Sequence, residues 1–146
     1  DSKMTERDNK RLDLLIWFRL SRVYLNSLKG SNQHLKQWGL SAAQFDVLVQ
    51  VGTSKRISQN ELAEKLFVTK GNITQLLTKM EELDLVERQQ EWRTKYVQLT
   101  KKGQDVFNEV TPLQERVQAE HFSALNKEEK KQLLTLLKKL QQNGGK

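Results

Sequence analysis

Hydrophobic residues recur every three or four positions along most of the chain, which is the spacing of helices with one buried face. Three of the expected helix starts carry a capping box, because Ser41, Ser58 and Asn126 are each followed by Gln or Glu three residues later. Gly30 lies inside the first expected helix, so a break there is the alternative to one long helix. The pattern predicts helices over about 9–39, 41–51, 59–66, 70–83, 100–121 and 127–142.

Residues 85–99 follow the pattern of a β-hairpin instead. Lys95–Leu99 alternates polar and apolar residues as a half-buried strand does, and Leu85 and Val86 lead into the strand before it. The polar stretch between them carries Arg88, Glu91, Trp92 and Arg93, with Lys95 just behind. The sequence therefore predicts a basic hairpin directly after the helix over 70–83.

The helix over 70–83 has two unlike faces. Its apolar side consists of Ile73, Leu76, Leu77, Met80 and Leu83. The opposite side consists of Gly71, Thr74, Gln75 and Thr78, flanked by Lys70 and Lys79. Small residues allow close approach, and amide and hydroxyl groups can read base edges, so this side is typical of a helix that enters a DNA major groove. The alternative is a loosely specified surface helix. Gly71 costs about 1 kcal/mol of helix stability against Ala, which makes sense if a phosphate or sugar comes close.

Helix, turn, helix and basic hairpin is the order of a winged helix-turn-helix protein, and the motifs resemble the MarR family of transcription regulators. The matching pieces are ELAEKLFVTKGNITQLLTKMEELDLVER over 61–88, EWR over 91–93 and VQLTKKG over 97–103. The family has Asp-x-Arg at the wing tip, where this chain has Glu91-Trp92-Arg93. Glu91 keeps the carboxylate that would orient Arg93, but on a longer side chain.

The resemblance implies a dimeric repressor whose two recognition helices read a roughly palindromic operator in double-stranded DNA. Arg56 and Ile57 would form a brief strand that pairs with the wing. The residues expected at base edges are Thr74, Gln75 and Thr78. Those expected to hold phosphate are Ser58, Gln59, Lys70, Asn72 and Lys79, with Gly71 allowing close approach. From the wing, Arg93 would enter the minor groove while Arg88 and Lys95 contact the backbone.

The terminal helices are more apolar than one small domain can bury, and Trp17, Phe18 and Tyr24 widen the apolar stripe of the first. We therefore expect a mostly α fold with a small β-hairpin wing. Residues 1–146 would form one domain, with a winged helix-turn-helix lobe over about 41–103 and dimerisation helices over about 8–38 and 104–142. An intramolecular bundle of the terminal helices is the alternative to a homodimer.

Composition agrees with this interpretation. The formal net charge of +7 favours a polyanion as partner, and 146 residues are enough for one domain. The absence of cysteine excludes disulfides and a thiol switch. Neither a run of 18 apolar residues nor a leader peptide is visible, so we expect no membrane span, and the family would place the protein in the cytoplasm.

Catalytic and metal-binding patterns are absent from the sequence. His34 and His121 are far apart and have no Cys or carboxylate at metal-ligand spacing. No glycine-rich phosphate loop or nucleophile elbow is present either. We therefore expect neither an enzyme nor a bound metal or cofactor.

The resemblance also implies a small-molecule site between the dimerisation helices and the DNA-binding lobe. Trp17, Tyr24, Trp38 and Phe45 are the aromatic candidates for it, and they would favour a flat aromatic or phenolic effector; the alternative is that they are ordinary core residues. A second function from another class is a winged-helix module that contacts proteins without binding DNA. Salt dependence separates the two functions, because phosphate contacts make DNA affinity fall steeply with salt.

Overall fold

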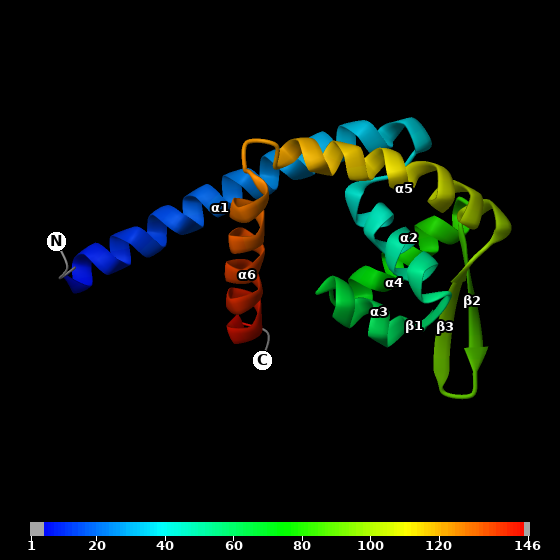
Figure 1. Ribbon diagram of the computed structural model, residues 1–146. Helices are drawn as coiled ribbons and strands as arrows, with labels where there is room; N and C mark the ends of the chain where they lie inside the picture. Colours follow the sequence, from blue (N-terminus) through cyan, green and yellow to red (C-terminus); the bar gives the residue numbers. More distant parts are fainter. Residues whose placement is uncertain (1–4, 145–146) are drawn as a thin grey trace.

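A computed structural model describes residues 5–144, which form an elongated helical part and a winged lobe (Figure 1). The expected fold class, mostly helical with a small β-hairpin wing, is confirmed. The elements are α1 (Glu6–Leu35), η1 (Lys36–Trp38), α2 (Ala42–Ser54), β1 (Arg56–Ser58), α3 (Gln59–Leu66), α4 (Lys70–Glu82), β2 (Val86–Glu91), β3 (Thr94–Leu99), α5 (Lys101–His121) and α6 (Lys127–Gly144).

The wing is a three-stranded antiparallel sheet in the order β1-β3-β2. Ile57 of β1 is paired with Val97 of β3, and Gln90 of β2 is paired with Lys95 of β3. The short strand expected at Arg56 and Ile57 is thus confirmed. Strands β2 and β3 extend away from the helices as a narrow hairpin (Figure 1).

The core of the lobe lies between α2, α3, α4 and the inner face of the sheet. It consists of buried apolar side chains, the largest of which are Leu48, Leu62, Ile73, Leu77 and Met80. Burial of each such side chain stabilises the fold by about 1.5–3 kcal/mol. The apolar side expected for α4 is confirmed for three of its five members, and Leu76 is half-buried. Leu83 is the exception, because it caps the end of α4 and is 37% exposed.

Helix α1 runs through Gly30 without a break, so the expected long helix is confirmed and the alternative of a break at this glycine is wrong. The glycine provides room for a neighbour: a β-carbon at this position would lie 3.0 Å from Nε2 of His121. His121 and His34 both belong to a polar seam between α1 and α5. His121 Nδ1 lies 2.7 Å from the Ser27 hydroxyl, and His34 Nδ1 lies 2.7 Å from Oε1 of the buried Gln114.

Helix α2 is longer than expected. Its start at Ser41 has the complete capping box with Gln44, but the helix passes through Gly52 and ends at Ser54. The glycine that follows the expected end at residue 51 therefore does not terminate the helix. A β-carbon there would lie 2.8 Å from the Phe107 ring, so the position is small because α5 packs closely on α2.

The amino-terminal half of α1 projects away from the rest of the chain, and α6 descends from the turn after α5 (Figure 1). Between Leu12 and Leu25, α1 exposes ten large hydrophobic side chains by 39–61%: Leu12, Leu14, Leu15, Ile16, Trp17, Phe18, Leu20, Val23, Tyr24 and Leu25. Helix α6 likewise exposes Leu134, Leu136 and Leu140. The terminal helices therefore do not close into a bundle within one chain. None of the helices in residues 5–144 is long and apolar enough to cross a membrane.

Candidate nucleic-acid interface

Helices α3 and α4 form the helix-turn-helix unit. The Ser58 hydroxyl caps α3 by accepting from the Glu61 N–H at 3.1 Å. The reciprocal half of the expected capping box is not formed, because the Glu61 carboxylate accepts from that same hydroxyl at 3.2 Å. Phe67 turns the chain in the left-handed region at φ 55°, and Thr69 caps α4 by accepting from the Asn72 N–H at 3.0 Å.

The outer side of α4 is exposed as expected. It presents Lys70, Gly71, Asn72, Thr74, Gln75, Thr78 and Lys79 to solvent. A β-carbon at Gly71 would meet no atom within 4 Å, so nothing in the described part of the chain requires a glycine there.

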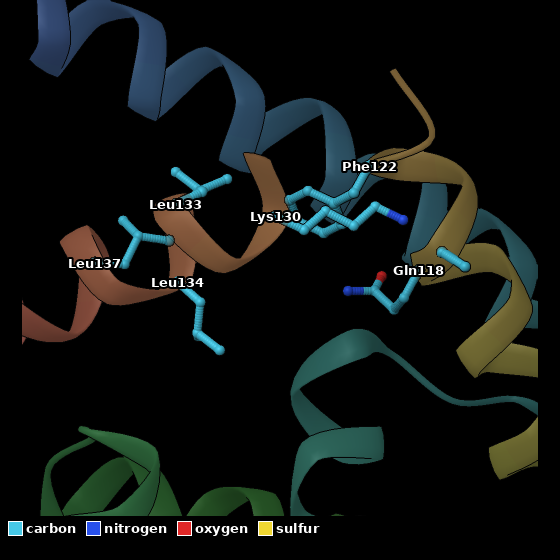
Figure 2. Close-up of a pocket in the computed structure, with 7 residues that line it drawn as sticks. Gln118, Phe122, Lys130, Leu133, Leu134 and Leu137 are labelled. Carbon is cyan, nitrogen blue, oxygen red and sulfur yellow. The ribbon is translucent and has the colours of Figure 1, made fainter. Parts of the chain in front are cut away.

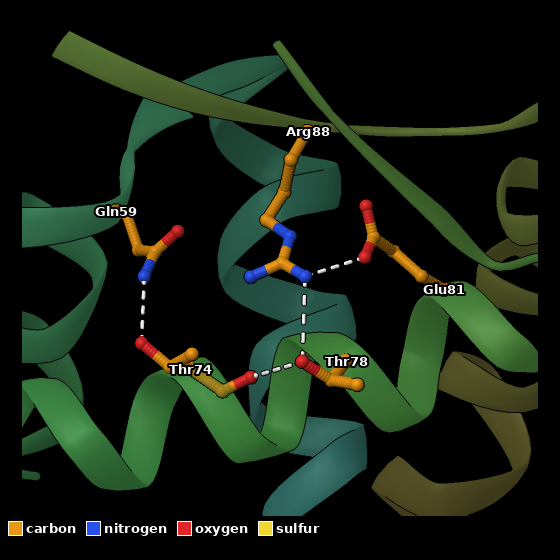
Figure 3. A network of polar contacts seen from close by, with 5 residues as sticks. All are labelled: Gln59, Thr74, Thr78, Glu81 and Arg88. Carbon is orange, nitrogen blue, oxygen red and sulfur yellow. Dashed lines mark hydrogen bonds and ion pairs between the residues drawn. The ribbon is translucent and has the colours of Figure 1, made fainter. Parts of the chain in front are cut away.

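Two of the three residues expected at base edges already have partners within the protein. The Thr74 hydroxyl donates to the Lys70 carbonyl at 2.8 Å and accepts from Gln59 Nε2 at 3.0 Å. The Thr78 hydroxyl donates to the Thr74 carbonyl at 2.9 Å and accepts from Arg88 Nη2 at 3.3 Å (Figure 3). Gln75 makes no such side-chain bond within residues 5–144, so its amide is available for a base.

Gln59 braces the two helices instead of extending toward solvent. Its Nε2 donates to Thr74, and its Oε1 is buried and unpaired among the described residues (Figure 3). The structure thus places this expected phosphate ligand between α3 and α4.

Arg88 joins the wing to α4. Its guanidinium donates to Glu81 Oε1 at 2.5 Å, and its side chain is only 16% exposed (Figure 3). Arg88 lowers the pKa of the Glu81 carboxyl, chiefly through this hydrogen bond. The resemblance implied a DNA-backbone contact for Arg88, whereas in the structure its guanidinium is paired within the protein. A pairing between a helix and a following strand has no local signal in the sequence, which is why it was missed.

The wing tip has a different ion pair from the expected one. Glu91 pairs with Arg56, whose guanidinium also lies 3.7 Å from the centre of the Tyr96 ring. Glu91 therefore does not orient Arg93, and that expectation is wrong. Arg93 instead lies over the Trp92 ring at 4.6 Å, while Arg56 lowers the pKa of Glu91 through their hydrogen bond. Lys95 is exposed on β3.

The base of the wing is locked to the start of α5. The Thr100 hydroxyl donates to the Asp84 carbonyl at 2.6 Å and accepts from the Gly103 N–H at 2.9 Å. A β-carbon at Gly103 would overlap the Leu85 carbonyl oxygen. At the end of the matching piece VQLTKKG, two backbone segments therefore lie so close together that no larger residue fits at Gly103.

The four aromatic residues proposed for an effector are not gathered at one place. Trp17 and Tyr24 are exposed on α1, whereas Trp38 and Phe45 pack against the core of the lobe. Tyr24 lines an apolar cavity of about 530 Å³ between α1 and α6, together with Phe122 and Leu133. A neighbouring cavity of about 350 Å³ is shown in Figure 2; it is lined by Gln118, Ala119, Phe122, Lys130, Leu133, Leu134 and Leu137.

Metal binding has no support in the described residues. Within 5–144, no group of three or more His, Cys, Asp or Glu side chains is placed to hold a metal ion.

An exposed, nearly neutral helix face beside a basic wing defines a winged helix-turn-helix DNA-binding protein. Residues 38–91 match the model of the MarR family. An HTH-type transcriptional regulator from Bacillus cereus is 40% identical over 141 residues, which cover 96% of this chain and 95% of the relative. The chain belongs to the MarR family of transcription regulators.

Solved structures agree with this assignment. A cysteine-to-serine mutant of Escherichia coli MarR in complex with operator DNA is 26% identical, with a TM-score of 0.79 over 93% of this chain and 99% of that chain. An organohalide-sensing regulator bound to 2,4-dichlorophenol shares the fold, at 20% identity and a TM-score of 0.85 over 98% and 87% of the two chains. The family and its relatives are transcription regulators, so the expectation that the chain is not an enzyme holds.

Proposed function

We propose that the protein is a dimeric repressor that recognises a pseudo-palindromic operator through α4 and the wing. The observation that carries the proposal is the outer side of α4, which is exposed, uncharged at its centre and held against the wing by Arg88. Such a ridge can enter a major groove without the desolvation cost of unpaired charges. The protein would act in the cytoplasm, where its DNA lies.

A homodimer accounts for the exposed apolar side chains of α1 and α6. Ten exposed large hydrophobic residues between Leu12 and Leu25 of one helix form a larger apolar surface than a soluble monomer normally exposes. In a two-fold dimer, the first and last helices of each subunit can cover those of the other. The two copies of α4 would then lie about 34 Å apart, one turn of DNA.

The structure leads us to divide the candidate DNA contacts into two groups. Gln75 would read a base edge, with the exposed Thr74 and Thr78 beside it. Ser58, Lys70, Asn72, Lys79 and Lys95 would hold the phosphate backbone, Gly71 would let it approach, and Arg93 would enter the minor groove. Gln59 and Arg88 would not contact DNA themselves. They would position the Thr74 and Thr78 hydroxyls, to which their side chains donate hydrogen bonds.

We further propose that a small aromatic or phenolic effector releases the DNA. A regulator of the same fold has been solved with 2,4-dichlorophenol bound, and the apolar cavity beside Tyr24 in this chain has room for a molecule of that kind. Trp17, Trp38 and Phe45 stay candidates for contacts that form in the dimer. An effector that binds one spacing of the two α4 helices better would shift the population away from the DNA-binding state.

Selection of bound fragments from random duplexes tests the function. We expect a two-fold symmetric site whose affinity falls steeply with salt, since each phosphate contact releases counterions. Release by a panel of phenols and quinones then tests the effector. Absence of any bound duplex, or affinity that does not change with salt, would favour a protein-contact role instead.

A further inference from the structure

Trp92 occupies the tip of the wing, in the two-residue turn between β2 and β3. Trp92 is 84% exposed, which is the largest exposed fraction of any large hydrophobic residue in the described part of the chain. Its backbone is in the left-handed region, at φ 56°. Both properties are unfavourable for a tryptophan in an isolated chain.

The fold alone gives no reason for a tryptophan at this position. The first residue of a two-residue hairpin turn with positive φ is best filled by glycine, and a residue with a β-carbon is strained there by roughly 1–2 kcal/mol. An exposed indole also gains nothing from burial. A strained residue that contributes little to the core points to a function outside the folded chain.

Two neighbouring side chains contact Trp92, one at its backbone and one at its indole ring. Gln90 Nε2 donates to the Trp92 carbonyl at 2.9 Å, and the Arg93 guanidinium lies over the indole at 4.6 Å. One residue before, Glu91 is fixed by Arg56, which itself rests on Tyr96. The tip therefore presents an aromatic ring and a cation side by side on a braced hairpin.

We propose that Trp92 is itself a DNA-contacting residue, whose indole packs against deoxyribose at the edge of the minor groove that Arg93 enters. This inference rests on the proposed function. The C–H groups of the sugars offer an apolar surface to one face of the indole. The Arg93 guanidinium lies on the other face, where the negative potential of the minor groove attracts it. Excluding water from the pair also strengthens its cation–π attraction.

Three substitutions in the full-length chain test the role: Trp92→Gly, Trp92→Phe and Arg93→Ala. Each is assayed for affinity to the selected duplex over a range of salt, and for thermal unfolding. We expect Trp92→Gly to bind about tenfold or more weakly while unfolding at the same or a higher temperature, because glycine relieves the turn. Trp92→Phe should recover most of the affinity.

Salt dependence separates a direct contact from an effect on Arg93. Arg93→Ala should reduce the log–log salt slope by about one, whereas Trp92→Gly should leave the slope unchanged because an indole neutralises no phosphate. Wild-type affinity with Trp92→Gly, or a slope reduced as in Arg93→Ala, would overturn the inference while leaving the proposed function intact. If the wild-type protein binds no duplex at all, the proposed function itself fails.

Discussion

The Arg88 guanidinium lies 2.5 Å from the Glu81 carboxylate and 3.3 Å from the Thr78 hydroxyl, so one side chain of the wing contacts two residues of α4 that are one helical turn apart. These two contacts connect the wing to α4. The position of the wing tip relative to α4 is therefore fixed, and so is the spacing of the DNA contacts that each would make.

Breaking this ion pair should loosen the wing. We expect Glu81→Gln to lower the free energy of unfolding by about 1 kcal/mol or less, since the pair is partly exposed, and to weaken operator binding several-fold. Glu82→Gln is the matched control, because Glu82 is its exposed neighbour on the same helix. Equal effects of the two substitutions on DNA affinity would show that the pair does not position the wing.

The same pair predicts a pH dependence. Arg88 holds the pKa of Glu81 below its usual range, so the pair stabilises the folded chain above the unfolded pKa of about 4.3. That stabilisation is lost as the pH falls through the lower pKa of the folded state. Urea unfolding at pH 7 and pH 3 should therefore show a difference between the wild type and Glu81→Gln at pH 7 that shrinks at pH 3. A difference that is constant across this range would argue against the pair as its source.

Two glycines should respond in opposite ways to alanine. Gly103→Ala should destabilise the fold by about 3 kcal/mol, because its β-carbon would overlap the Leu85 carbonyl oxygen. Gly71→Ala should keep or raise the free energy of unfolding, by at most about 1 kcal/mol, yet weaken DNA binding if a phosphate lies close. Thermal unfolding and duplex titration of both variants check this. Full operator affinity in a stable Gly71→Ala variant would remove Gly71 from the interface.

A charge on the exposed stripe of α1 should dissociate the proposed dimer. Leu15→Glu places a carboxylate among the exposed apolar residues, so we expect monomers in sedimentation and a melting temperature that no longer rises with protein concentration. Gln33→Glu is the control, because it adds the same charge at an exposed polar position of α1. A wild-type protein that is already monomeric at micromolar concentration would contradict the dimer.

Local signals explain what could be predicted from the sequence. The caps at Ser41, Ser58 and Asn126 act within a few residues, and the structure has all three. Helical spacing predicts the apolar side of α4, and that prediction is wrong only at Leu83, where the helix ends.

Contacts between distant elements could not be predicted. Arg56 and Glu91 are 35 positions apart and meet only because β1 and β2 flank the same strand. Glycine often ends a helix, but Gly52 lies inside α2, where its missing side chain leaves room for the Phe107 ring. Arg88 and Gln59 were expected at phosphates since exposed polar residues beside a recognition helix usually face DNA; their partners Glu81 and Thr74 lie on another element.

The most direct test of recognition by α4 is the ratio of affinities for the selected duplex and a scrambled one, measured for the wild type, Gln75→Ala and Lys79→Ala. The exposed Gln75 amide should carry base discrimination, so Gln75→Ala should lower the ratio by about tenfold or more. Lys79→Ala should weaken both duplexes about equally and leave the ratio unchanged. If Gln75→Ala weakens both duplexes equally, or the wild-type ratio is one, α4 does not read the operator.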